Sequence, residues 1–135
     1  MKAAVAGPAE AAAGLGDVGP NDFSAANEYL RAGAAAVVAH PPISTPVPLH
    51  ELGDWYRALL DQLEGPLILY NIPQTTGVSI PLDTVAALAE HPKVIGIKDS
   101  ENQRQRHVQL LQRFGNRPDF SVFIGVGALM AQGLK

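Results

Sequence analysis

Two side chains that could carry out chemistry together stand at the ends of two apolar runs. Lys98 closes the run 94–98, and Tyr70 closes the run 66–70, one strand–helix unit earlier. Adjacent parallel strands lie about 4.8 Å apart, so the two side chains would converge at one edge of a sheet. A desolvated amine can be uncharged at working pH and attack a carbonyl carbon, while a phenol can carry the protons. The pair therefore predicts chemistry through a lysine Schiff base.

Each of these residues alone also has a structural explanation. A lysine after four apolar residues is commonly a side chain that reaches from a strand end into solvent. A lone tyrosine in such a run is commonly a half-buried core aromatic. The joint pattern, with Asn71-Ile72-Pro73 directly after the tyrosine, favours the functional interpretation.

The composition is that of one soluble globular domain. The chain has 135 residues, of which 47% are hydrophobic and 17% charged. A net charge of -3 without a basic block argues against a nucleic-acid binder and a polybasic membrane anchor. The absence of cysteine excludes disulfides and thiolate metal sites. Because the sequence shows no signal peptide and no bilayer-spanning apolar run, we expect a cytoplasmic protein.

Strand-length apolar runs alternate with segments of helical periodicity. The expected strands are 3–6, 34–39, 66–70, 93–98 and 120–125. The expected helices are 23–32, 49–63, 81–91 and 101–114, and a further helix is expected to begin at 128–131. The expected connections are a Gly/Ala-rich segment over 7–20, a proline-rich loop over 40–48 and a turn over 75–77. Asp99 and Ser100 are expected to cap the helix that follows them.

Alternating strands and helices of this kind predict the α/β class. Strands that are apolar on both faces indicate a parallel sheet covered by helices. Five such strands fit either an open doubly wound sheet or part of a closed barrel, and periodicity does not choose between them.

Two helices have clear expected faces. The buried face of 49–63 consists of Leu52, Trp55, Tyr56, Leu59, Leu60 and Leu63, and that of 101–114 of Val108, Leu110, Leu111 and Phe114. The arginines of the second helix, Arg104, Arg106 and Arg113, are interpreted as a solvated face. The four histidines, His40, His50, His91 and His107, are too scattered for a metal site and are interpreted as surface or loop residues.

Two motifs carry a family resemblance. The segment 70–77, Tyr-Asn-Ile-Pro-Gln-Thr-Thr-Gly, followed by 95–99, Ile-Gly-Ile-Lys-Asp, resembles the strand-end motifs of the dihydrodipicolinate synthase and N-acetylneuraminate lyase family. Members of that family are pyruvate-dependent Schiff-base aldolases on (βα)8 barrels. More loosely, 5–7 resembles the third barrel strand, 34–42 the fourth and 123–125 the seventh. Since a barrel takes roughly 250 residues, the resemblance implies one partial TIM-barrel domain over 1–135, strands three to seven.

The resemblance also implies roles for particular residues. Lys98 would form the imine and Tyr70 would carry protons, while Thr75, Thr76 and Gly125 would lie against the substrate. The implied substrates are a small 2-oxo acid and an aldehyde, with no cofactor and no metal ion. Full-length members are expected to be homo-oligomers.

Several positions depart from the family pattern and leave specificity open. Thr75 stands where the synthases usually have an arginine for the substrate carboxylate, and Pro42 and Ile43 replace a tyrosine pair that relays protons. Val126 and Gly127 replace acidic residues that sugar-acid lyases use. The loop that binds the pyruvate carboxylate belongs to a strand absent from this sequence. The acceptor aldehyde and the direction of reaction therefore stay open.

Two other interpretations remain open at this point. The glycine pattern of 14–19 matches GxGxxG and would suit an open-sheet nucleotide binder, although a plain Gly-rich loop explains it better. Alternatively, the chain is a non-catalytic barrel fragment that pairs with another chain through its exposed strand edges.

Overall fold

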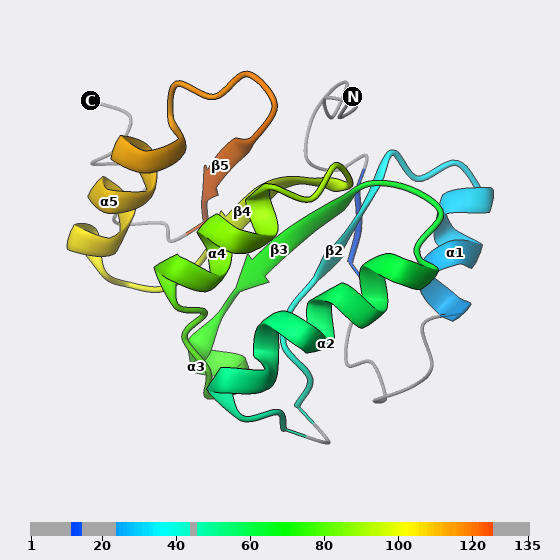
Figure 1. Cartoon of the computed structure of the whole chain (residues 1–135), viewed down its shortest axis with the longest axis horizontal. Coiled ribbons are helices and arrows are strands. Elements are labelled where there is room, and N and C mark those ends of the chain that lie inside the picture. Colours follow the sequence, from blue (N-terminus) through cyan, green and yellow to red (C-terminus); the bar gives the residue numbers. More distant parts are fainter. Residues whose placement is uncertain (1–11, 15–23, 44–45, 126–135) are drawn as a thin grey trace.

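The chain alternates strands and helices along its length (Figure 1). The computed structural model describes residues 12–14, 24–43 and 46–125. The elements are β1 Ala12–Gly14, α1 Ser24–Arg31, β2 Ala36–Ala39, α2 Leu49–Gln62, β3 Leu67–Asn71, α3 Pro73–Thr76, α4 Leu82–Ala89, β4 Val94–Asp99, α5 Arg104–Phe114 and β5 Ser121–Ile124. Among the helices in these described segments, none is long and apolar enough to cross a membrane.

The five strands form one parallel sheet in the order β1-β2-β3-β4-β5. Each strand lies beside the strand that precedes it in the chain. A doubly wound nucleotide-binding sheet reverses its strand order at a switch point, where the ligand binds. The described strands have no reversal, so their order is that of a barrel segment and argues against the open-sheet alternative.

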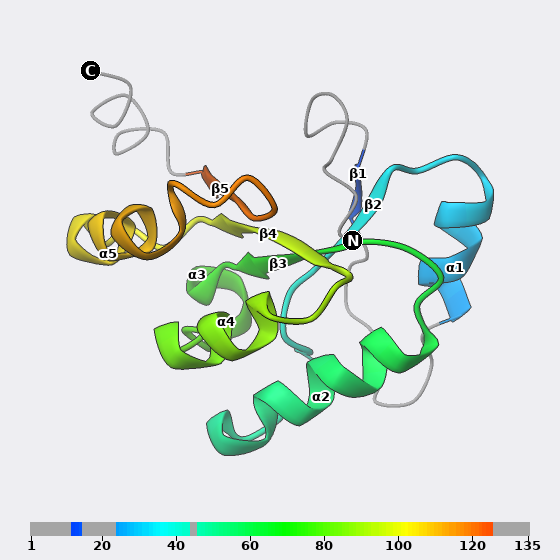
Figure 2. The same ribbon diagram turned by 45° about the horizontal axis from the view of Figure 1, so that its top comes forward.

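The two faces of the sheet are covered differently. Side chains alternate along each strand, so Leu67 and Leu69 of β3 and Ile97 of β4 join the large core beneath the helices. Figure 2 shows the sheet lying above α2 and α4 on this side. The opposite face carries a smaller cluster made of Ala36, Ile68 and Ile95, with Val38 and Phe123 packed against it.

Helix α2 is the largest helical contribution to the core and confirms its predicted face. Its expected apolar residues are all buried: Leu52, Trp55, Tyr56, Leu59, Leu60 and Leu63. The Tyr56 hydroxyl donates a hydrogen bond of 2.9 Å to the carbonyl of Ala39 at the end of β2. Burial raises the pKa of Tyr56 far above its ordinary value, so this hydroxyl stays a neutral donor. The contact fixes the end of β2 against the helix layer.

The first strand is not where the sequence predicted it. The strand that pairs with β2 is Ala12–Gly14, inside the segment expected to be a connection. The predicted strand over 3–6 and the segment 5–7 that resembles the third barrel strand both lie outside the described residues. A run of alanines carries no alternation and no β-branched residues, so only its pairing with β2 marks it as a strand.

Two helical predictions also need correction. Helix α5 begins at Arg104 rather than 101, and Val108 and Leu111, expected in the core, are 43% and 46% exposed, while Leu110 and Phe114 are buried. The expected turn over 75–77 is instead the end of the short helix α3, which stops at Gly77 with φ 74°. Glycine adopts this left-handed conformation without steric cost.

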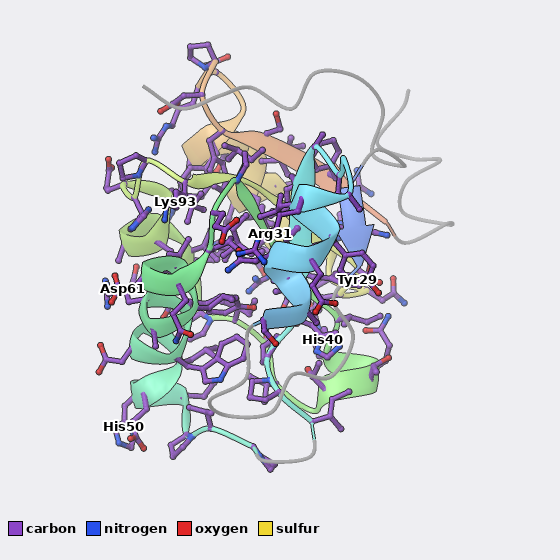
Figure 3. All side chains as sticks on the ribbon, turned by 90° about the vertical axis from the view of Figure 1, so that its right-hand side faces the viewer. Tyr29, Arg31, His40, His50, Asp61 and Lys93 are labelled. Carbon is purple, nitrogen blue, oxygen red and sulfur yellow. The ribbon has the colours of Figure 1, made fainter. Side chains whose placement is uncertain are left out.

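Lys93, just before β4, holds the end of α2, and its replacement should cost stability. Its Nζ donates hydrogen bonds to the carbonyls of Leu60 at 2.9 Å and Leu63 at 2.5 Å, at the helix end, where the Leu60 carbonyl also accepts a longer hydrogen bond of 3.3 Å from the Leu63 amide. Figure 3 shows Lys93 beside the last turn of α2. We expect Lys93→Met to lower the free energy of unfolding by about 1 kcal/mol, measured by urea denaturation.

Arg31→Met is the matched control for this measurement. Arg31 pairs with Glu64 close to the same helix end, but its side chain is 65% exposed. An exposed pair contributes little, so this variant should lose much less stability than Lys93→Met. Equal losses in the two variants would contradict the assignment of Lys93 as the group that satisfies the helix carbonyls.

Candidate active site

Lys98 and Tyr70 meet at the carboxyl ends of adjacent strands, as predicted. They are register partners of β4 and β3, and both side chains are half-buried. The Lys98 Nζ lies 4.9 Å from the centroid of the Tyr70 ring. Alternation places both on the sheet face opposite the helices, the face that carries Ile68. An amine and a phenol are thus held side by side where barrel enzymes place their reacting groups.

His40 continues this row onto the next strand. It follows directly after β2, whose Ala39 pairs with Leu69, so His40 is level with Tyr70. The ring centroids of His40 and Tyr70 are 6.4 Å apart, with the ring planes tilted by 59°. The interpretation of His40 as an ordinary loop histidine therefore missed a contact that only strand pairing creates.

Gly125 leaves space beside the lysine. Its amide donates to the carbonyl of Asp99 at 2.9 Å, which brings the end of β5 against the end of β4. A Cβ at this position would lie 3.3 Å from the Lys98 Cε and 2.7 Å from the Ser100 Oγ. Any side chain here would press on the lysine stem, so glycine keeps that stem in place.

Thr75 and Thr76 belong to α3, just beyond Tyr70 in the chain. Their backbone amides both donate to the carbonyl of Ile72 at 3.0 Å. The Thr76 hydroxyl lies 3.1 Å from both the amide and the carbonyl of Val78 and is occupied locally. The Thr75 side chain is exposed. The hydrogen bonds of the short helix thus occupy amide groups that an open turn would have left available to a ligand.

A buried polar network lies beneath the Lys98–Tyr70 pair, on the helix-covered face. Asn71 and Asp99 follow Tyr70 and Lys98 in the strands and are both 0% exposed. The Asn71 Nδ2 donates to Asp99 Oδ2 at 3.0 Å and to Glu101 Oε1 at 2.9 Å, while its Oδ1 accepts the Ile80 amide at 2.8 Å. Every hydrogen-bonding group of this amide is therefore used, which joins the two strand ends to the loop before α4.

Asp99 is the hub of this network rather than a helix cap. Its Oδ2 accepts a hydrogen bond of 2.7 Å from Arg106 Nε, and its Oδ1 accepts the Glu101 amide at 3.1 Å and lies 3.3 Å from His107 Nε2. Helix α5 begins after Gln103, which makes no side-chain cap. The prediction that Asp99 and Ser100 cap this helix is wrong, because the Asp99 carboxylate lies between the strand ends and the side of the helix, where it accepts hydrogen bonds from both.

The interpretation of two α5 residues as solvent-exposed is also wrong. The Arg106 side chain is 10% exposed, and His107 is 5% exposed. A signal for His107 was present in the sequence, since His107, Leu110 and Phe114 recur at helical spacing on one face. The position of Arg106 had no such signal, because it depends on a carboxylate in a different element.

Glu101 completes the network at its solvent edge. Burial alone would raise the pKa of its carboxyl. Hydrogen bonds from Ser79 and Asn71, together with the charge of Arg106, outweigh burial and hold that pKa below its ordinary value. The carboxylate stays charged and keeps the Ser79 hydroxyl, 2.6 Å from its Oε1, in place.

Comparison with known proteins gives one family. The profile of the Dihydrodipicolinate synthetase family matches residues 4–135. An uncharacterized DapA-like lyase from Pyrobaculum aerophilum is 32% identical over 110 residues, 81% of this chain and 36% of that protein. The 4-hydroxy-tetrahydrodipicolinate synthase of Stenotrophomonas maltophilia is 35% identical over 100 residues, 74% of this chain and 33% of that enzyme. The crystal structure of dihydrodipicolinate synthase from Agrobacterium tumefaciens superposes with a TM-score of 0.80 at 27% identity, over 91% of this chain and 44% of that one.

The chain spans less than half the length of these relatives, between 33% and 44%. Its sequentially ordered parallel sheet covers part of the barrel that they form. The chain belongs to the Dihydrodipicolinate synthetase family, and its α/β fold is an incomplete TIM-barrel segment.

Proposed function

We propose that this chain carries the Schiff-base centre of a carbon–carbon lyase or aldolase that acts on a pyruvate-type 2-oxo acid. The observation that supports this most is the position of Lys98 Nζ, 4.9 Å from the Tyr70 ring centroid at paired strand ends. The carboxylate next in the chain, Asp99, is engaged by Arg106 and Asn71 on the opposite face. The carboxylate that follows Lys98 in the chain is therefore not available to form an ion pair with the Lys98 amine.

The reaction begins with the neutral Lys98 amine attacking the keto carbon of the 2-oxo acid. The nitrogen loses a proton, the carbonyl oxygen gains one, and a carbinolamine results. Tyr70 then gives a proton to the carbinolamine hydroxyl, which leaves as water, and a protonated imine forms. This cation withdraws electrons from the adjacent carbon, so a carbon–carbon bond to an aldehyde can form or break there.

Three further residues are proposed to form the substrate site. Gly125 borders the Lys98 stem and leaves room for the bound 2-oxo acid. Thr75 presents an exposed hydroxyl from α3, and Thr76 holds the shape of that helix end. The partner substrate is an aldehyde, and we propose that the complete enzyme assembles from identical subunits.

Reductive trapping tests the proposed function directly. The chain is incubated with pyruvate and borohydride, digested, and mapped by mass spectrometry. We expect one stoichiometric adduct on the peptide that contains Lys98, because only an imine is reduced to a stable secondary amine. A mass gain on another lysine, or no adduct at all, contradicts the proposal.

Tyr70→Phe should slow imine formation without preventing it. The variant keeps the ring under the Lys98 amine and removes only the hydroxyl that carries protons. Loss of a general acid–base group typically costs about 10²- to 10⁴-fold in rate, so we expect trapping to reach the same end point at least a hundredfold more slowly. Tyr29→Phe is the control, since Tyr29 is 47% exposed on α1. An unchanged trapping rate would remove Tyr70 from the mechanism.

A further inference from the structure

We propose that His40 exchanges protons with Tyr70 during the reaction, acting through the phenol rather than on the substrate. This inference rests on the proposed function and adds a third residue to the Lys98–Tyr70 pair. It assigns a role to a side chain at the end of β2 that the sequence pattern left as a loop residue.

The position of His40 is fixed from two sides. The Ala39 carbonyl before it is held by the Tyr56 hydroxyl at 2.9 Å, and Ala39 is in register with Leu69. His40 therefore points to the face opposite the helices, where its ring lies 6.4 Å from that of Tyr70. Its side chain is half-buried, so it neighbours the phenol while keeping access to solvent.

The hydrogen bonding of the imidazole ring defines which nitrogen can accept a proton. The Nδ1 of His40 lies 2.6 Å from the carbonyl oxygen of Pro41. A carbonyl only accepts, so Nδ1 carries the hydrogen, and the Nε2 of the neutral ring is left with a lone pair. Within residues 24–43 and 46–125 no hydrogen bond occupies Nε2. Imidazole is the side chain that ordinarily gains and loses a proton between about pH 5 and 8.

Among residues 40–43, the described residues that directly follow β2, His40 alone has a side chain that can exchange a proton in this way. Pro41, Pro42 and Ile43, which follow in the loop, carry no exchangeable side-chain proton. Within residues 24–43 and 46–125, the titratable groups that face His40 from neighbouring strands are Tyr70 on β3 and, beyond it, Lys98 on β4. Tyr56 lies on the other face with its hydroxyl donated to Ala39. A proton leaving the Lys98–Tyr70 pair toward β2 therefore meets His40 first.

The proposed exchange balances with the chemistry of the imine. When Tyr70 gives its proton to the departing water of the carbinolamine, the protonated His40 gives the Nε2 proton to the phenolate. His40 then regains a proton from solvent. When the imine is hydrolysed, the same proton passes in the opposite direction. No oxidant, reductant or additional reactant is involved.

The test compares His40→Phe with His50→Phe. Phenylalanine keeps an aromatic ring beside Tyr70 but has no nitrogen, and His50 lies far away in the first turn of α2 with its side chain 82% exposed (Figure 3). The reaction followed is exchange of the pyruvate methyl protons in D2O, measured by NMR between pH 5.5 and 8. We expect His40→Phe to slow exchange at least about tenfold and to flatten its pH dependence, with the trapped adduct still on Lys98. His50→Phe should match the unaltered chain.

The outcomes separate the role of His40 from the proposed function. If the unaltered chain forms no adduct, both proposals fall together. If the adduct forms but His40→Phe keeps the same exchange rate and pH profile, only the role of His40 is overturned. A nitrogen-15 NMR spectrum gives a second readout without activity: we expect the neutral His40 ring to carry its hydrogen on Nδ1, and a hydrogen on Nε2 would overturn the proposal.

Discussion

Replacing Lys98 by methionine is expected to abolish imine chemistry in this chain. Methionine keeps much of the apolar stem that packs beside Gly125 but has no amine. Without a nucleophile no carbinolamine forms, so exchange of the pyruvate methyl protons should fall at least about a thousandfold. Borohydride should leave no adduct on the mapped peptide. Exchange that persists at the original rate would show that Lys98 is not the reacting group.

Lys93→Met provides the matched control for this loss. Both lysines flank the same strand, but Lys93 precedes β4 and donates to α2 carbonyls at the opposite end of the sheet. It should retain the adduct and the exchange rate, although it costs stability. The control separates loss of one particular amine from a general effect of removing a lysine.

Chemical rescue makes the assignment of Lys98 more specific. The sequence contains no cysteine, so Lys98→Cys introduces the only thiol of the chain. Alkylation of that thiol with 2-bromoethylamine rebuilds a side chain of lysine length that ends in an amine. We expect exchange to be absent before alkylation and to return in part afterwards. Failure of the alkylated chain to trap pyruvate would contradict a role that depends on the amine alone.

Asp99→Asn is expected to cause the largest loss of stability of any single substitution at the site. The carboxylate is 0% exposed and accepts from Arg106 at 2.7 Å and from Asn71 at 3.0 Å. The variant keeps the shape but removes the carboxylate to which the Arg106 guanidinium, 10% exposed, donates, and leaves Glu101, 3.6 Å away, as its remaining ion partner at the site. Breaking a buried ion pair from one side costs about 3–5 kcal/mol. Urea denaturation followed by circular dichroism measures this loss.

Two further variants identify the cause of that loss. Asp83→Asn removes a carboxylate that is 96% exposed and 3.5 Å from Arg113, and it should cost less than about 0.5 kcal/mol. The double variant Asp99→Asn with Arg106→Met should lose less free energy of unfolding than the sum of the losses of the two single variants, because no uncompensated charge remains buried. Strictly additive losses would mean that Asp99 acts through Asn71 or Glu101 rather than through Arg106.

The network and the reacting pair are linked by strand alternation. Tyr70 and Asn71 occupy successive positions of β3, and Lys98 and Asp99 occupy successive positions of β4. Successive side chains point to opposite faces. The hydrogen bond from Asn71 to Asp99 on the helix-covered face therefore helps to fix the strand register that places Tyr70 beside Lys98 on the other face. The polar residues behind the sheet thus position the two side chains to which we assign the proposed chemistry.

The sequence by itself determined the class of the fold and the two residues at the centre of the candidate site. Strand length and helical period are local properties, so 66–70, 94–98 and the buried face of α2 could be identified without contacts. Lys98 and Tyr70 followed from them, because each closes an apolar run. The strand order decided between a barrel segment and an open sheet, which periodicity could not do.

Only the tertiary structure decided how residues from different elements meet. The pairing of Ala12–Gly14 with β2, the burial of Arg106 against Asp99 and the approach of His40 to Tyr70 all join segments that are distant in the chain. A run of alanines, an arginine on a polar helix and a histidine before two prolines look unremarkable locally. Their roles arise from strand register and from the need to compensate a buried carboxylate, and both are set by the packed sheet as a whole.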